Sequence, residues 1–402
     1  MRELQQGSDI LIAGQVQTND LHKALGLCAP IAPTATRASL PSTTQVKLTI
    51  GNGVLVLETT DTEQLMQVSM PCIHEGKDTG SVLVPARELK DLVKGLDKKQ
   101  RVSLIELDKD VQVVQGGTTL LLKAMNAEEF PPNLSREWMP AARVRADRFL
   151  HSITRALDSV ATEDSRPVLA AAKLELKKTM RMVSADGFVL SVHTDEEIPQ
   201  PAPEGYATET TLIPVGTLKT LKRTLKAVAG ELLIERSVDG RVLQITTRHA
   251  SNNTKLWQTS LVQGTFPQYA KLIPDHRAHI ATFFELGTEA HLAAIKPLLP
   301  IAKAGSGTLR MIVSTRGIRW VVSDGESGKD SDAFVECKTE IGRDGDGEPQ
   351  HTKVALNATF VKELLTTFKG ESVKGGITTP SSPVMLNASG TTRVIMPMFV
   401  QW

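Results

Sequence analysis

Residues 211–230 read TLIPVGTLKTLKRTLKAVAG, and the spacing of their leucines predicts the element on which the fold is built. Leu218, Leu221 and Leu225 recur every three or four residues, which is the spacing of one face of an α-helix. Such a face needs another apolar surface to cover it. The stretch therefore predicts an amphipathic helix that packs its leucines on a sheet.

A second face of this helix is cationic. Lys219, Lys222, Arg223 and Lys226 are centred roughly 130° around the helix from the leucines. Like charges at these spacings repel each other by a few tenths of a kcal/mol per pair. An ordinary solvated face is one interpretation, and a surface for a polyanion is the other.

The pattern around this helix occurs three times along the chain. The motif Pro-x-x-x-Leu at 85–89 returns at 214–218, and the third copy has Leu356 and Phe360 in the corresponding places. Each unit is roughly 130 residues long, a common domain size, and combines two helices with several antiparallel strands. The predicted helices are 18–27, 85–96, 146–161, 211–230, 289–302 and 357–370.

This order predicts an α+β protein with three similar domains. Residues 1–15 are expected to be an N-terminal extension, and the domains to span 16–138, 139–277 and 278–402. Hairpins are predicted around Gly-Asn-Gly within 46–61, and as a pair of strands around Lys-Lys-Thr within 171–192. Residues 323–333 and 342–350 are expected to form loops.

Composition limits the function. The 402 residues include 46 basic and 45 acidic side chains, for a net charge of +1, so any cationic surface must be balanced elsewhere. Aromatic residues make up only 4%, which argues against a base-stacking platform. The cysteines, Cys28, Cys72 and Cys337, are too far apart for a zinc motif and indicate a reducing cytoplasm. No apolar run approaches membrane-spanning length.

Catalytic motifs are absent from the sequence. Asp61, Asp186 and Asp324 occupy similar places, one per predicted domain, so a shared metal centre is a weak alternative. His276 and His279 are the only close histidine pair, in a proline-flanked linker. There is no phosphate-binding loop and no nucleophile elbow. We expect no cofactor, no metal and no enzymatic activity.

Short motifs along all three units resemble those of a known family. They are Arg37-x-x-Leu40-Pro41, ETTDTE (58–63), VPAREL (84–89), AEEFP (127–131), EDSRPVL (163–169), SADGFVLSV (184–192), GTFPQYAKLIP (264–274) and VIMPM (394–398). Their order and separation resemble the bacterial sliding clamp, the beta subunit of DNA polymerase III. The resemblance implies a DNA-clamp fold and a head-to-tail homodimer ring with pseudo-sixfold symmetry.

That resemblance also implies partners. The ring would encircle double-stranded DNA without reading its sequence and tether the replicative DNA polymerase, after an external ATP-driven clamp loader has opened it. Such a protein is cytoplasmic, is associated with the nucleoid during replication, and does not bind membranes. For Arg166 an ion pair with Glu163 or Asp164 is an open alternative. The implied DNA contacts are Arg37, Lys90, Lys94, Arg148, Arg155, Arg166, Lys219, Lys222, Arg223 and Lys226.

Partners of this family insert a short peptide between the second and third domains. The deep part of that groove would be Leu169, Ala185, Gly187, Leu190, Pro267, Leu272, Val394 and Met396. The shallow part would be Phe188, Asn357, Phe360, Ser381, Pro397 and Met398, with Lys271 nearby. From the residues alone, VIMPM could instead be a final strand with a frayed tail, and Asp-Gly an ordinary hairpin turn.

Three departures from the family leave the peptide preference open. Phe188-Val189 stands where His-Arg is frequent, Lys271 replaces a common arginine, and the chain continues as Phe399-Val400-Gln401-Trp402. A specialised clamp of a mobile element or a repair pathway is therefore one alternative function. A metal-dependent DNA-processing enzyme is the other.

Overall fold

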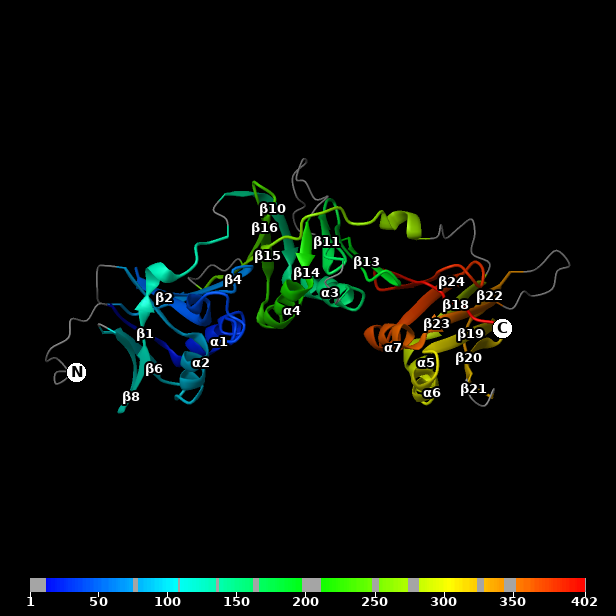
Figure 1. The fold of residues 1–402 in the computed structure, drawn as a ribbon, viewed down its shortest axis with the longest axis horizontal. Coiled ribbons are helices and arrows are strands. Elements are labelled where there is room, and N and C mark those ends of the chain that lie inside the picture. Colours follow the sequence, from blue (N-terminus) through cyan, green and yellow to red (C-terminus); the bar gives the residue numbers. More distant parts are fainter. Residues whose placement is uncertain are drawn as a thin grey trace. The chain divides into compact units, whose positions relative to one another are not determined.

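The structure is a computed structural model that describes residues 12–74, 79–107, 109–134, 137–161, 166–196, 211–247, 253–273, 282–323, 329–342 and 352–401. Among the helices within these ranges, none is long and apolar enough to cross a membrane. The chain forms two compact units (Figure 1). Unit 1 takes in the described residues of Met1–Asp147 and Thr220–Leu261, and unit 2 those of Arg148–Glu197, Ala207–Lys219 and Val262–Trp402.

The same order of elements recurs three times. A strand and a helix are followed by three strands, then by a strand, a second helix and three more strands. The first repeat adds one short strand to this order, and the third adds one helix and one short strand. The first repeat contains β1 (Ile12–Gln17), α1 (Thr18–Cys28), β2 (Gln45–Gly51), β3 (Val54–Thr60), β4 (Gln64–Pro71), β5 (Gly80–Pro85), α2 (Ala86–Lys94), β6 (Arg101–Glu106), β7 (Asp110–Gln115), β8 (Thr118–Lys123) and the short β9 (Met125–Asn126).

The second repeat contains β10 (Trp138–Arg145), α3 (Ala146–Leu157), β11 (Ala171–Leu176), β12 (Met180–Ala185), β13 (Val189–Asp195), β14 (Leu212–Pro214), α4 (Val215–Thr224), β15 (Glu231–Ser237), β16 (Val242–Thr247) and β17 (Lys255–Ser260). The third contains β18 (Thr282–Gly287), α5 (Thr288–Ile295), α6 (Leu299–Ala304), β19 (Thr308–Ser314), β20 (Gly317–Ser323), β21 (Asp330–Glu336), β22 (Thr339–Ile341), β23 (Thr352–Asn357), α7 (Ala358–Thr367), β24 (Ser372–Ile377), β25 (Val384–Ala388) and β26 (Thr391–Ile395).

Each unit holds one four-stranded and one nine-stranded antiparallel sheet. Unit 1 has the orders β1-β6-β7-β8 and β10-β15-β16-β17-β4-β3-β2-β5-β9. Unit 2 has β14-β11-β12-β13-β26-β25-β24-β18-β22 and β21-β20-β19-β23. The nine-stranded sheets join strands of consecutive repeats, at the seam β17–β4 in unit 1 and the seam β13–β26 in unit 2.

Equivalent backbone hydrogen bonds support the threefold repetition. The first amide of the first helix donates to the residue just before the strand that follows the second helix, in every repeat. The bonds run from Thr18 N to Gln100 O (3.2 Å), from Ala146 N to Gly230 O (2.9 Å) and from Thr288 N to Glu371 O (3.4 Å). The predicted α+β fold with repeated helix pairs is thus confirmed, whereas the exact domain limits at 138/139 and 277/278 stay predictions.

The helices cover the sheets with apolar faces. In unit 1, α1 and α2 lie side by side and bury Leu21, Leu25, Leu89 and Val93 (Figure 1). In unit 2, α5, α6 and α7 pack with the strands around Trp320. The predicted turn at Gly-Asn-Gly is confirmed, because Asn52 (φ 52°) and Gly53 (φ 74°) adopt the left-handed backbone that tight hairpins need.

Several details of the predicted elements are wrong. Residues 330–333, expected within the loop 323–333, belong to the strand β21, and the predicted helix 211–230 begins with the strand β14. The predicted helix 289–302 is two helices, α5 and α6, because Pro297 cannot donate the amide hydrogen bond that would continue α5. Residues 171–192 hold three strands rather than two, because a second turn forms at Asp186-Gly187. The helix α4 ends at Thr224 and tightens into a 3-10 turn at Leu225–Ala227, before Gly230 (φ 89°) redirects the chain into β15.

Candidate functional site

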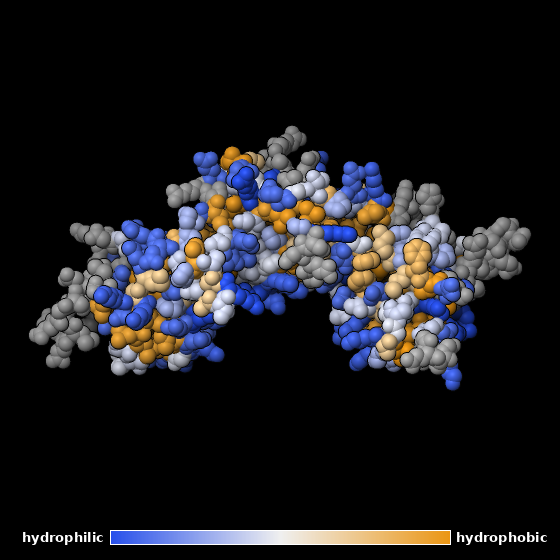
Figure 2. Space-filling view, in the orientation of Figure 1, coloured by the Kyte–Doolittle hydropathy of each residue, from blue (hydrophilic) through white to orange (hydrophobic). Residues whose placement is uncertain are grey.

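The helix α4 separates its leucines from its cations as predicted. Leu218, Leu221 and Leu225 are buried. Three of the four cations, Lys219, Arg223 and Lys226, are exposed, and Lys222 is half-buried. Figure 2 shows hydrophilic side chains gathered over this helix. Within the described ranges none of the four forms an ion pair, so their charge is available to an anion in solution.

The first repeat carries a second cationic cluster, on α1 and α2. Lys94 is exposed and Lys90 is half-buried. Burial, and then the charges of Lys98, Lys90 and Lys94 in that order, lower the pKa of His22 on α1. The three lysines therefore lie near one side chain and form one cluster. Lys98 was not among the predicted contacts because it follows the helix, although the run Lys98-Lys99 was the available signal.

The remaining predicted cations differ in their surroundings. Arg37 and Arg148 are exposed, as a DNA contact requires. Arg166 is exposed as well, and it lines a cavity described below. The proposed ion pairs of Arg166 with Glu163 or Asp164 lie outside the described residues.

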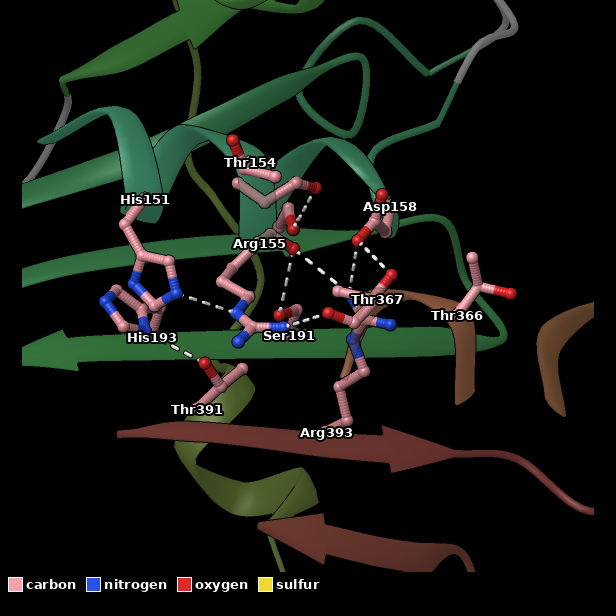
Figure 3. Close-up of polar contacts among 12 residues, drawn as sticks. His151, Thr154, Arg155, Asp158, Ser191, His193, Thr366, Thr367, Thr391 and Arg393 are labelled. Carbon is pink, nitrogen blue, oxygen red and sulfur yellow. Dashed lines mark hydrogen bonds and ion pairs between the residues drawn. The ribbon is translucent and has the colours of Figure 1, made fainter. Parts of the chain in front are cut away.

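Arg155 does not fit the predicted role. Its residue is only 4% exposed, and its guanidinium donates to Glu371 Oε1 (2.5 Å), to Thr367 O (2.7 Å) and to His151 Nε2 (3.2 Å), as Figure 3 shows in part. The same group lies 4.2 Å from the centre of the Phe368 ring. The expectation that Arg155 contacts DNA is therefore wrong, because its side chain is buried and its donors already have partners within the protein.

Around Arg155 lies a network of buried polar groups within unit 2 (Figure 3). Arg393 on β26, 1% exposed, donates to Asp158 Oδ2 (3.1 Å) and to the backbone oxygen of Arg155 (3.2 Å). His193 is bonded through Nδ1 to Thr391 Oγ1 (2.9 Å). Burial, followed by the neighbouring His151 and Arg155, lowers the pKa of His193 to about 4.

The deep part of the predicted groove forms around one apolar cluster in unit 2. Four of its predicted residues, Leu169, Ala185, Leu190 and Val394, belong to this cluster or pack against it. Phe266 and Met385 also belong to it, although neither was predicted. The available signal for Phe266 was its position beside Pro267 in the motif GTFPQYAKLIP.

Other predicted groove residues lie at the surface. Pro267, Lys271 and Leu272 are exposed, and Leu272 is 41% accessible. Gly187 has a φ of 99°, so a side chain there would strain the turn that leads into β13. Met396 is half-buried, and its backbone amide donates to Phe188 O (2.8 Å).

The shallow part contains an aromatic pair. Phe188 and Phe360 stack with ring centres 6.3 Å apart and planes 28° from parallel, while 63% of Phe188 stays exposed. Asn357 caps α7, because its side chain accepts a hydrogen bond from Thr359 N (2.9 Å). Ser381 is exposed in a polar turn and bonds with Thr379.

The chain after β26 is held in place through residue 401. Met398 N donates to Ala355 O (2.8 Å), and Arg310 Nη2 donates to Gln401 O (3.1 Å). Pro397 is half-buried, whereas Phe399 is 97% exposed. The frayed-tail alternative is therefore wrong for residues 396–401, and Trp402 lies outside the described residues.

A cavity of about 1000 Å³ adjoins the groove. It shares Leu169, Gly187 and Phe188 with the groove and includes Arg166. The sequence did not indicate its other walls, because they combine the end of α3 with the exposed side of α7. These additional lining residues are Leu157, Asp158, Val160, Ala161, Asp186, Lys362, Glu363, Thr366 and Thr367. Burial, and then the charge of Asp158, raise the pKa of Glu363.

The repeated aspartates have structural roles. Asp61 Oδ1 accepts from Gln64 N (2.6 Å), and Asp186 Oδ1 accepts from Val189 N (2.7 Å), so each closes the turn before an equivalent strand. No group of three or more metal-binding side chains occurs among the residues that the structure describes. Asp324, His276 and His279 lie outside that part of the chain.

Comparisons with known proteins agree with this architecture. The family model described as DNA polymerase III beta subunit, N-terminal domain, matches residues 15–135. The beta sliding clamp of Escherichia coli K12 is 23% identical over 384 residues, which cover 91% of this chain and 94% of that protein.

Solved clamp structures share the fold. A Pseudomonas aeruginosa DNA polymerase sliding clamp with ligand superimposes with a TM-score of 0.83 at 20% identity, covering 97% of this chain and 100% of the other. A Bartonella birtlesii sliding clamp bound to griselimycin gives 0.81 at 18% identity, with the same coverage of both chains. These relatives are described as sliding clamps, which favours neither of the two alternative functions, the DNA-processing enzyme and the specialised clamp. Residues 15–135 thus match the family model of the DNA polymerase III beta subunit, and the chain as a whole has the fold of the solved sliding clamps.

Proposed function

We propose that this protein is a non-catalytic processivity clamp that closes as a dimer around duplex DNA and tethers a replicative polymerase to it. The single observation that carries this proposal is the pair of sheet seams. In each seam the last strand of one repeat pairs with the fourth strand of the repeat before it, as β17 does with β4 and β26 with β13. Among the described strands, this rule leaves two without a seam partner: the strand of the first repeat that corresponds to β17 and β26, and the strand of the third repeat that corresponds to β4 and β13.

The two unused strands are β8 and β21. Among the described strands, β8 pairs only with β7 and β21 only with β20, so each is the edge of a four-stranded sheet. An edge strand exposes unpaired backbone donors and acceptors that another chain can pair with. If β8 of one copy pairs with β21 of the next, two copies form a closed ring with two equal heterologous interfaces.

The existing seams also define a register for that interface. Leu256 lies opposite Gln67 in the seam β17–β4, and Thr392 lies opposite Val192 in the seam β26–β13. Following the strand ladders back through each repeat shows that these two pairs are equivalent positions. A third seam between copies would use the same positions.

In the first repeat the position equivalent to Leu256 is Thr119, and in the third repeat the position equivalent to Gln67 is Asp332. We therefore place Thr119 of one copy opposite Asp332 of the other. Two residues along, Leu121 lies opposite Asp330. Leu121 is 62% exposed in the single chain, which suits a side chain that becomes covered on pairing.

DNA binding is proposed for exposed and half-buried cations on the repeated helices and in the segments that follow them. Their attraction to phosphates is independent of base sequence and falls as salt rises, which allows a ring to slide. The net charge of only +1 implies that acidic residues elsewhere offset this surface. The proposed contacts are Arg37, Lys90, Lys94, Lys98, Arg148, Arg166, Lys219, Lys222, Arg223 and Lys226.

The groove is proposed as the binding site for the polymerase and other clamp-binding proteins. It combines a buried apolar floor around Leu190 with an aromatic rim at Phe188 and Phe360, the arrangement by which a short peptide is anchored. That a related clamp was solved with griselimycin supports a ligand site in this fold. Loading onto DNA would need a separate ATP-driven loader, and the protein would work in the cytoplasm at the nucleoid.

Retention on DNA of different topology tests the proposal. The protein, loaded by a bacterial clamp loader with ATP, is expected to remain on nicked circular DNA through gel filtration and to run off the same DNA after it is cut at one site. Equal retention on both forms would contradict encirclement. Native mass spectrometry of the free protein should give twice the 43.6 kDa chain mass.

A further inference from the structure

Two buried arginines connect α3 with α7 in unit 2. Arg393 donates from Nη2 to Arg155 O in the last turn of α3 (3.2 Å), and Arg155 donates from Nη1 to Thr367 O at the last residue of α7 (2.7 Å). Each guanidinium thus caps the carbonyl end of a helix, where the helix dipole favours a cation. The two helices are held by side chains that reach across from other elements.

Two carboxylates balance the two arginines. Glu371 accepts from Arg155 Nη2 (2.5 Å) and from Ser389 Oγ (2.6 Å), while Asp158 accepts from Arg393 Nη2 (3.1 Å). The ring of Phe368 stacks with both guanidiniums, at 4.2 Å from Arg155 and 5.4 Å from Arg393. Because the forks of the arginines are planar and rigid, such contacts determine orientation as well as distance.

The network also reaches the cavity beside the groove. Thr367 Oγ1 donates to Asp158 Oδ2 (2.6 Å), as Figure 3 shows, and both side chains belong to the lining of the cavity of about 1000 Å³. Asp158 stands at the end of α3 and Thr367 at the end of α7, so the network joins two walls of the cavity. Arg155, Glu371 and Arg393 do not line it.

We propose that Arg155, Glu371 and Arg393 are positioning residues for partner-peptide binding, because they hold the ends of α3 and α7 at the separation that shapes the cavity and the adjoining groove. This inference rests on the proposed function of the groove. An apolar junction could hold two helices at least as stably, since desolvating two ion pairs is costly. The contacts present here additionally define one relative placement of the two cavity walls.

Two variants test the proposal without altering a cavity wall. Glu371→Gln keeps the size of the side chain and removes its charge, and Arg155→Lys keeps the charge and removes the forked pair of donors. We expect each to weaken binding of griselimycin and of a replicative-polymerase tail peptide about tenfold, mainly through faster dissociation. Lys47→Gln is the matched control, because it breaks a partly buried ion pair with Glu58 in unit 1 (3.5 Å).

All binding is measured well below the melting temperature, so a variant that is only less stable keeps wild-type affinity. Lys47→Gln should lower stability and leave both dissociation constants within about twofold of wild type. Unchanged affinity in Glu371→Gln and Arg155→Lys would overturn the inference. If Arg155→Lys does not fold, the more conservative Glu371→Gln decides alone.

Hydrogen exchange gives a second readout that does not depend on a peptide. Glu371→Gln should speed exchange about tenfold in the last turns of α3 and α7, and leave β12 unchanged. Protection equal to wild type in both turns would refute the positioning role. If wild type binds neither probe, the proposed groove fails, and the exchange comparison still decides whether these residues hold the helix ends.

Discussion

The burial of His291 predicts that acid lowers the free energy of unfolding of the protein. The side chain is fully buried, and Trp320 Nε1 donates to its Nδ1 (3.0 Å), which requires the neutral ring to carry its proton on Nε2. That nitrogen has no hydrogen-bond partner among the described atoms. A second proton would have to enter at Nδ1, facing the Trp320 N–H. Burial lowers the pKa of His291 from 6.5 to about 4.

The size of the effect follows from this pKa difference. Between pH 6.5 and about 4 the unfolded chain binds a proton that the folded chain does not, so stability falls as the pH drops. Compared with neutral pH, His291 alone should cost about 2 kcal/mol near pH 5 and about 3 kcal/mol below pH 4. Stability is unaffected by this group above pH 7, where both states hold it neutral.

The assay is urea denaturation near pH 7.5 and near pH 5, followed by tryptophan fluorescence. His291→Asn keeps an acceptor for Trp320 and cannot titrate, so it should lose about 2 kcal/mol less between the two pH values than wild type. The smaller volume of asparagine destabilises the variant equally at both pH values, so this cost cancels in the difference between them. Trp320→Phe, which removes the hydrogen bond and keeps most of the burial, should retain most of the pH dependence. An equal loss in His291→Asn and wild type would refute the reasoning.

Three further predictions concern the ring, the DNA and the groove. Leu121→Asp should convert the dimer to monomer in native mass spectra, because the new charge would face Asp330 at both interfaces. Leu121→Lys should preserve the dimer, and equal masses for the two variants would contradict the register. Reversing the four cations of α4 and its following turn should flatten the dependence of DNA affinity on salt by about 0.9 per lost phosphate contact, with the circular dichroism spectrum unchanged; an unchanged slope would show that this surface does not meet DNA. Met396→Ala combined with Leu190→Ala should weaken binding of a polymerase-tail peptide at least tenfold and keep the dimer mass, so loss of the dimer would identify these residues as interface or core instead.

Local chemistry explains why so much of the fold was predictable. Helical spacing depends only on neighbours in sequence, and so the apolar face of α4 could be identified without knowing what it covers. The turn at Asn52-Gly53 follows from the left-handed backbone that these residues tolerate. Pro297 inside the segment 289–302 is also a local signal, because a proline in a helical pattern favours the break that separates α5 from α6.

The candidate site was harder to predict because its parts come from distant segments. Arg148 and Arg155 lie two turns apart on α3 and look alike in the sequence, yet the first is exposed and the second is 4% exposed. The carboxylate that pairs with Arg155 belongs to Glu371, 216 residues away. No residue near Arg155 in the sequence of α3 indicates that partner.

By itself, the sequence determined the kinds of elements, their threefold order and the resemblance to the sliding clamps, because each depends on residues close together in the chain. The tertiary structure alone decided which cations stay exposed, which of the described strands are left as sheet edges, and where α3 and α7 line a cavity. These features depend on which distant groups meet, and burial then decides the outcome, since a charge removed from water must find a partner. For that reason Arg155 became part of the protein interior while Lys219, with the same charge on an equivalent scaffold, stayed in solvent.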